Sequence, residues 1–270
     1  MQLRVAGLSV AVESAHPTMG RALLAAWEPA VVAEEGPVDR HYRIAADAQV
    51  FLDGIAQFGD EPLSHRVAHI ELNLLNWVVA RHRGWALLHA GAVLFEGDLW
   101  IFVGDSGAGK SSFTRAALKR GGQYISDDAV FVRGAEVHGV ARSVQFDPRP
   151  NGDRDVPDYL RDCDLDSYEV PSESGVTCAV PLWRAGYSTL GTLRAPSGRV
   201  VVAEIRQAES LRIDRQDALG RLCALRAAAL ASGAEYDGSL GHGAAFSVAW
   251  AQPEEAFAGL VAELARLREA

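Results

Sequence analysis

The chain has 270 residues, of which 49% are hydrophobic and 23% charged, as in a globular protein of one large or two small domains. The formal net charge of −9 argues against nucleic acid as the main partner, because binding to a phosphate backbone needs a basic face. The opening residues alternate polar and apolar side chains, and no apolar run reaches about 18 residues, so we expect neither a signal peptide nor a membrane partner.

Residues 1–84 are predicted to form a β-rich N-terminal extension that ends in one helix. Segments 3–12 and 41–55 have strand-like patterns, separated by clusters of Pro, Gly and Glu. Apolar side chains then recur every three to four residues between Val67 and Val78, which is typical of an amphipathic helix, and Gly84 ends it.

Residues 85–270 are predicted to form the second domain, a nucleotide-binding core with C-terminal helices. The pattern predicts strands over 85–95, 99–104, 123–134, 187–193 and 199–205. A polar turn interrupts the segment 123–134. Helices are predicted over 110–120, 215–232 and 253–267. The acidic segment 147–169 has little periodicity and is either a solvated loop or a lid beside the phosphate site.

The three cysteines show neither a zinc pattern nor a disulfide framework in their spacing. We therefore interpret Cys163, Cys178 and Cys223 as structural thiols of a protein in the reducing cytoplasm.

Gly104 to Ser111 reads G-x-x-x-x-G-K-S, the Walker A spacing, between an apolar strand and a helix. The glycines allow a tight turn whose N–H groups surround an anion, and the helix adds the positive end of its dipole. Lys110 is expected to contact the β- and γ-phosphates and Ser111 to ligate Mg²⁺. The predicted nucleotide-binding residues are Gly104, Asp105, Ser106, Gly107, Ala108, Gly109, Lys110, Ser111 and Ser112.

The pair Asp127 and Asp128 ends the strand that follows the Walker A helix. A strand that returns beside the loop places two carboxylates there, one able to hold Mg²⁺ and the other able to accept a proton from a hydroxyl. The chain lacks the N/T-K-x-D motif of GTPases and the L-S-G-G-Q signature of transporter ATPases.

The stretch from Gly104 to Val132 resembles the core of HPr kinase/phosphorylase, whose loop reads G-D-S-G-x-G-K-S and is followed by K-R-G and a D-D pair. The resemblance implies Asp127 as catalytic base, Asp128 at Mg²⁺, and His89 in the active site. Arg184 is the weakest match. The family's E-I-R-G signature has no counterpart close to the Asp pair, and the first hundred residues do not match its regulatory domain. The layout is closest to short HPr kinase-like enzymes that phosphorylate lasso-peptide precursors.

Together these features predict an α/β protein with an HPr kinase/phosphoenolpyruvate carboxykinase-like nucleotide-binding core. The resemblance implies ATP and Mg²⁺ as cofactors and a seryl hydroxyl of a peptide or protein as acceptor. A kinase of a free small molecule and a non-enzymatic ATP-binding regulator are the alternatives. The sequence does not determine the oligomeric state, and it is compatible with a homo-oligomer.

Overall fold

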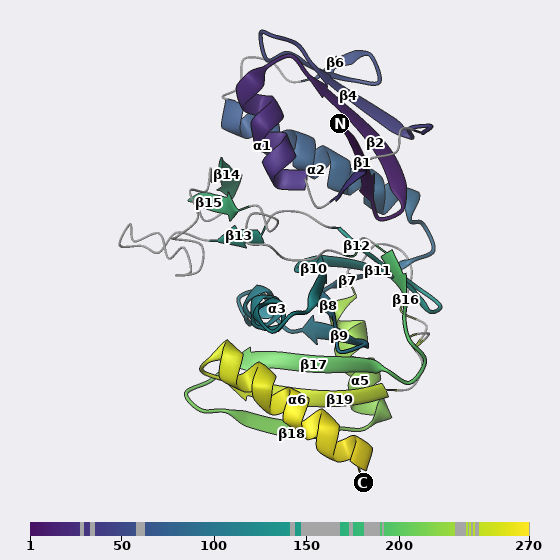
Figure 1. Ribbon diagram of the computed structural model, residues 1–270, viewed down its shortest axis with the longest axis vertical. Helices are drawn as coiled ribbons and strands as arrows, with labels where there is room; N and C mark the ends of the chain where they lie inside the picture. The colour runs from purple at the N-terminus through teal and green to yellow at the C-terminus, as the bar shows by residue number, and fades with distance from the viewer. Residues whose placement is uncertain are drawn as a thin grey trace. The chain divides into compact units, whose positions relative to one another are not determined.

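The structure, a computed structural model, describes residues 1–27, 30–32, 36–57, 63–140, 144–146, 168–172, 175–180, 190, 192–229, 236, 238, 240 and 243–269 (Figure 1). The chain divides into two compact units. Unit 1 comprises Met1–Arg81 and Ala141–Tyr187, and unit 2 comprises His82–Val140 and Ser188–Ala270. The fold is mixed α/β with several sheets, which agrees with the fold class expected from the sequence at that level.

Unit 1 contains a six-stranded sheet in the order β3-β1-β2-β4-β5-β6 and two helices. Its elements are β1 (Gln2–Val5), β2 (Leu8–Ser14), α1 (Pro17–Trp27), β3 (Val31–Val32), β4 (Arg40–Ile44), β5 (Val50–Leu52), β6 (Ile55–Gln57) and α2 (Leu63–Arg81). The predicted amphipathic face of α2 is buried at Val67, Ile70, Leu74 and Val78. Helix α1 was not predicted, although a proline suits the first position of a helix.

A three-stranded sheet, β13-β15-β14, also belongs to unit 1. It consists of β13 (Val144–Phe146), β14 (Tyr168–Ser172) and β15 (Gly175–Val180). Because β14 lies against α2, this part of the chain groups with the N-terminal unit, whereas the sequence-based division at residue 84 assigns it to the core.

The buried phenol of Tyr42 makes unit 1 sensitive to alkali. Its hydroxyl donates to Asn73 Oδ1 at 2.8 Å, and burial raises the pKa of Tyr42 from 10.0 to about 12. The unfolded phenol ionises first, so this contribution to stability is complete below pH 10 and is lost as the pH rises to 12. We expect the free energy of unfolding to fall by about 3 kcal/mol over that range. Chemical denaturation of the wild type and Tyr42→Phe should show that fall in the wild type alone, and an equal fall in both would contradict it.

Unit 2 is built on a six-stranded sheet in the order β10-β8-β9-β17-β19-β18. Its strands are β8 (Gly91–Phe95), β9 (Asp98–Val103), β10 (Gln123–Ser126), β17 (Val200–Gln207), β18 (Arg212–Gln216) and β19 (Gly243–Trp250). Strands β9, β17 and β19 are parallel, and β8 is antiparallel to both β9 and β10. Four strands, β10, β9, β17 and β19, therefore end at the same carboxyl edge, where open α/β sheets bind ligands.

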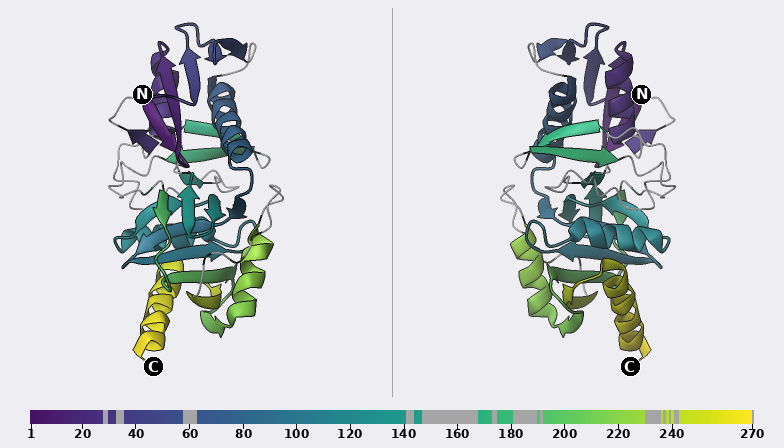
Figure 2. Two further views of the ribbon diagram at one scale, coloured as in Figure 1. Left: turned by 90° about the vertical axis from the view of Figure 1, so that its right-hand side faces the viewer. Right: turned by 90° about the vertical axis from the view of Figure 1, so that its left-hand side faces the viewer.

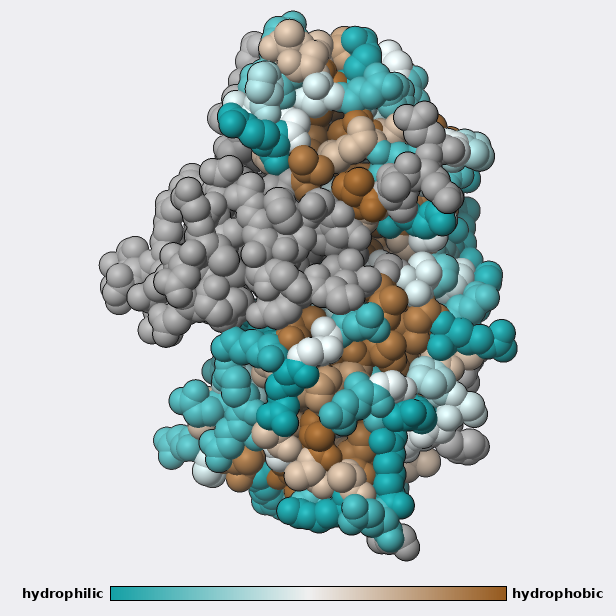
Figure 3. Space-filling view, in the orientation of Figure 1, coloured by the Kyte–Doolittle hydropathy of each residue, from teal (hydrophilic) through white to brown (hydrophobic). Residues whose placement is uncertain are grey.

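Helices cover both faces of this sheet. Helices α3 (Lys110–Lys119) and α6 (Pro253–Glu269) lie on one face, and α5 (Ala218–Ala228) lies on the other (Figure 2). The Lys119 ammonium donates to Glu254 at 2.8 Å and joins α3 to α6. In the space-filling view, hydrophilic residues flank α6 and β18 on the side of unit 2 that faces the viewer (Figure 3).

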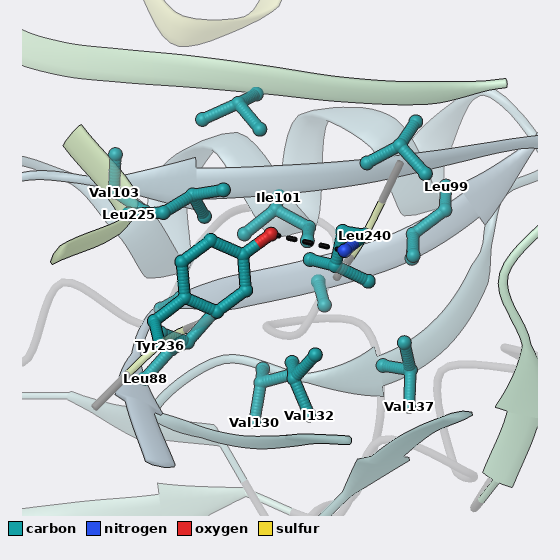
Figure 4. Close-up of a cluster of buried hydrophobic side chains, with 14 of the residues drawn as sticks. Leu88, Leu99, Ile101, Val103, Val130, Val132, Val137, Leu225, Tyr236 and Leu240 are labelled. Carbon is teal, nitrogen blue, oxygen red and sulfur yellow. Dashed lines mark hydrogen bonds between the residues drawn. The ribbon is translucent and has the colours of Figure 1, made fainter. Parts of the chain in front are cut away.

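A second sheet of unit 2, in the order β16-β12-β11-β7, packs over the face of the first sheet that α5 covers. It consists of β7 (Ala86–His89), β11 (Ala129–Arg133), β12 (Glu136–Gly139) and β16 (Thr192–Arg194). The core between the sheets joins Leu99 and Ile101 of β9 to Val130 and Val132 of β11 (Figure 4). Tyr236 lies in this core, and its hydroxyl accepts from the Leu240 amide at 3.1 Å.

Two C-terminal elements differ from the sequence-based prediction. The helix expected over 215–232 begins at Ala218, because residues 212–216 pair with β19 as strand β18. Asp217 caps the helix by accepting from the Gly220 amide at 2.7 Å. Strand β19 was not predicted. Across the described ranges, every helix is too short or too polar to span a bilayer.

Candidate active site

The glycine-rich loop, residues 104–109, connects the end of β9 to the start of α3 at the carboxyl edge of the six-stranded sheet. Its three glycines have positive φ angles of 152°, 77° and 99° at Gly104, Gly107 and Gly109, which side chains with a Cβ rarely adopt. Helix α3 begins at Lys110, so its unpaired N–H groups and the positive end of its dipole lie next to the loop. This is the geometry that binds anions.

Three side chains hold the carbonyl groups of the glycine-rich loop. Lys110 Nζ donates to the carbonyls of Gly104 and Asp105 at 3.0 and 3.1 Å. Gln207, at the end of β17, donates to the Gly107 carbonyl at 3.2 Å, and Trp250, at the end of β19, donates to the Ala108 carbonyl at 3.0 Å. In a trans peptide the C=O and N–H point in opposite directions, so the Trp250 contact turns the Gly109 N–H away from the indole.

Lys110 is buried, with 6% of its surface exposed. Burial lowers the pKa of Lys110 below its ordinary value, against the opposing charges of Asp128, Asp105 and Asp127 in decreasing order. The ammonium is therefore partly desolvated, and the negative charges of the three aspartates favour its protonated form. Its two carbonyl contacts are bonds that a phosphate oxygen could replace.

Asp127 is nearly buried and held by a neighbouring side chain. Its exposed fraction is 7%, and Oδ1 accepts from the hydroxyl of the fully buried Tyr124 at 2.8 Å. Ser126 supports the turn, because its Oγ accepts from the Asp128 and Ala129 amides at 3.4 and 3.1 Å. The Asp127 carboxylate is thus fixed in orientation by the strand that carries it.

Asp128 lies beside His89. The distance from Asp128 Oδ1 to His89 Nδ1 is 3.6 Å, and both side chains are about one-third exposed. The Asp128 carbonyl accepts from the Ala90 amide at 3.1 Å, which joins the β10–β11 turn to the β7–β8 connection. Because β8 lies between β10 and β9 in the sheet, the strand that ends at the Asp pair is one strand removed from β9, whereas the sequence suggested that it lies directly beside the loop.

The structure thus brings together Lys110, the Asp pair and His89 at one edge. Of the three serines predicted to bind nucleotide, Ser106 is exposed in the loop, while Ser111 and Ser112 are half-buried in the first turn of α3. The Ser112 hydroxyl accepts from Arg115 at 3.1 Å. Arg184 and the acidic segment 147–169, except its last two residues in β14, lie outside the described residues. Sequence reasoning missed three residues of the site, namely Tyr124, Gln207 and Trp250.

Asp98 anchors the beginning of β9, the strand that carries the loop. Arg199 Nε donates to Oδ1 at 2.9 Å and Arg268 Nη1 donates to Oδ2 at 2.8 Å. The carboxylate therefore joins β9 to the residue that precedes β17 and to the end of α6. Burial alone would raise the pKa of Asp98, but hydrogen bonds and charge from Arg268 and Arg199 hold it below its ordinary value. These contacts fix the strand at the end opposite the loop.

Gly109 is expected to be indispensable for the shape of the loop. A Cβ at this position would lie 2.1 Å from Cζ2 of the buried Trp250 ring, in addition to the strain of a φ of +99°. We expect Gly109→Ala to weaken the binding of ATP, the nucleotide that the sequence predicts for this loop, by about a hundredfold or more, because the loop must move away from the indole. Gly121→Ala is the matched control: its φ is +90°, but its Cβ would meet open space. Calorimetry should show normal ATP affinity in the control, and equal losses in both variants would contradict a role for the Trp250 contact.

The residues at this edge fit Mg²⁺ in chemistry. Mg²⁺ in phosphoryl-transfer sites needs one or two carboxylates, while phosphate oxygens and water complete its shell. Asp128 and Ser111 supply a carboxylate and a hydroxyl, both partly exposed. Among the described residues, no three His, Cys, Asp or Glu side chains converge as a metal site made of protein ligands alone would require.

Comparisons with known proteins find similarity in structure and none in sequence. No family model matches the sequence, and no curated protein matches it. Among solved structures, the chain is similar to the HPr(Ser) kinase/phosphatase from Coxiella burnetii, with 11% sequence identity over 68% of this chain and 95% of that chain and a TM-score of 0.30. A likeness this weak carries no functional conclusion.

Proposed function

We propose that this protein is an ATP- and Mg²⁺-dependent kinase that transfers the γ-phosphoryl group to a seryl hydroxyl of a peptide or protein. The observation that carries the proposal is the meeting of an anion-binding loop, a buried lysine and two carboxylates at one sheet edge. A turn with only a structural role would not need a lysine that is desolvated beside three carboxylates.

The loop and Lys110 would hold the phosphates. Backbone N–H groups of the loop and the start of α3 suit the phosphate oxygens, and Lys110 would exchange its carbonyl contacts for the β- and γ-phosphates. Mg²⁺, when bound, would neutralise charge on the transferred group. Ser111 and Asp128 would hold it, and Asp128 is the carboxylate whose charge affects Lys110 most.

Asp127 would accept the proton of the acceptor hydroxyl. The Tyr124 hydroxyl donates to Oδ1 and fixes the orientation of the carboxylate, so the acceptor hydroxyl would meet a base that is already positioned. His89, 3.6 Å from Asp128, would orient that carboxylate. The acceptor oxygen then attacks the γ-phosphorus, the bond from that phosphorus to the bridging oxygen of ADP breaks, and the proton remains on Asp127 until it is released.

Phosphosite mapping tests the proposal. The purified protein is incubated with ATP, Mg²⁺ and the peptide products of neighbouring genes, and phosphoserine is located by mass spectrometry against a Lys110→Ala control. We expect a phosphoserine that requires Lys110. A phosphorylated free amino acid or other small molecule would instead indicate a small-molecule kinase, and bound ATP without any transfer would indicate a regulator.

A further inference from the structure

A cavity of about 390 Å³ opens at the carboxyl edge of the six-stranded sheet, next to the glycine-rich loop. Gly104 and Asp105 of the loop line it, together with residues of β17, β19 and α5. Its volume lies in the range of sites that bind small molecules. The cavity therefore continues directly from the place where phosphates would lie.

The floor of the cavity is a row of three paired strand positions. Val103 of β9 pairs with Glu204 of β17, which pairs with Ser247 of β19, so the three side chains lie on the same face of the sheet. The row combines an apolar side chain with a carboxylate and a hydroxyl, and the last two can hydrogen-bond to the hydroxyls of a sugar.

The wall opposite this row comes from alanines of α5. Ala224, Ala227 and Ala228 line the cavity, and their small side chains leave room for a flat ring system. Arg206, two residues after Glu204 on the same face of β17, also lines it. Small apolar walls with a few polar groups are the usual surroundings of a heteroaromatic ligand.

The order of the strands indicates in which direction a bound nucleotide would run along the edge of the sheet. The Asp pair follows β10, and β17 lies three strand spacings away, about 14 Å, with the loop between them. We propose that the cavity receives the ribose and base of the nucleotide, so that the phosphate chain runs along the loop towards Asp127 and Asp128. This inference rests on the proposed function and adds where the nucleoside lies, with Glu204 and Ser247 facing the ribose.

Binding of ATP and of inorganic tripolyphosphate, each with Mg²⁺, tests the inference, because tripolyphosphate has no nucleoside. Ala227→Phe fills the cavity from an exposed position, so we expect ATP to bind at least about tenfold more weakly and tripolyphosphate to bind as in the wild type. Leu219→Phe, at a 66% exposed position on the same helix, is the control and should change neither affinity. Glu204→Gln retains the shape of the side chain and should weaken ATP alone, by a few-fold.

Three results would overturn the inference. ATP affinity that is normal in both Ala227→Phe and Glu204→Gln would mean that the nucleoside lies elsewhere. Equal weakening of ATP and tripolyphosphate would mean that the substitutions act on the phosphates and that the cavity contributes nothing to binding of the nucleoside. If the wild-type chain binds neither ligand, the proposed function fails and this inference fails with it, whereas tripolyphosphate binding that depends on Lys110 would support the phosphate site independently.

Discussion

Replacement of Lys110 with Ala is expected to reduce ATP affinity by about a hundredfold. The ammonium makes charge-assisted contacts to phosphate, and loss of such contacts costs about 3 kcal/mol. The variant should fold, because the substitution removes a cation whose pKa is already lowered by burial. Calorimetric titration with ATP and Mg²⁺ measures the effect.

Lys119→Ala is the matched control for this prediction. Lys119 lies at the opposite end of α3, where it pairs with Glu254 on the surface, and exposed ion pairs contribute at most about 1 kcal/mol. We expect its ATP affinity to equal that of the wild type. Undiminished affinity in Lys110→Ala, or equal losses in both variants, would contradict the assignment of the loop as the phosphate site.

Asp127→Asn is expected to leave ATP·Mg²⁺ binding nearly normal and to slow phosphoryl transfer at least about a hundredfold. The amide oxygen can still accept from the Tyr124 hydroxyl, so the turn should keep its shape, but the amide cannot take a proton. Single-turnover transfer with labelled ATP measures the rate of the chemical step apart from binding.

Asp128→Asn is expected to raise the Mg²⁺ concentration needed for half-maximal transfer, because an amide is a weaker ligand of Mg²⁺ than a carboxylate. A Mg²⁺ titration of both Asp variants distinguishes their roles. Rescue of Asp127→Asn by added Mg²⁺, with no rescue of Asp128→Asn, would reverse the two assignments. Normal transfer in both variants would leave the pair as a structural turn.

Local features of the site could be predicted from the sequence. The loop, the start of α3 at Lys110 and the turn at the Asp pair all follow from residues close together in the chain. Glycine conformational freedom, helix-start chemistry and an apolar strand before the loop each point to the same local structure. In the structure these elements lie at one sheet edge.

Long-range features could not be predicted. Trp250 contacts the carbonyl of Ala108 across 142 positions of sequence, and nothing in its own segment indicates that partner. Strand β8 lies beside β9 because the two form a hairpin, but its other neighbour, β10, follows α3 in the chain, and neither segment indicates that pairing. The grouping of 141–187 with unit 1 likewise depends on tertiary contacts, among them those between β14 and α2.

The fate of the γ-phosphoryl group in a single turnover tests the central claim most directly. The wild type, Lys110→Ala and Asp127→Asn are each mixed with γ-labelled ATP, Mg²⁺ and the acceptor found by phosphosite mapping, and both bound and transferred label are followed. We predict that the label appears on serine in the wild type and that Lys110→Ala binds labelled ATP about a hundredfold more weakly and transfers correspondingly less of the label. We predict that Asp127→Asn binds labelled ATP nearly normally but transfers the label at least about a hundredfold more slowly. Label that all three proteins transfer to serine at the same rate, or that the wild type releases only as inorganic phosphate, would contradict the account.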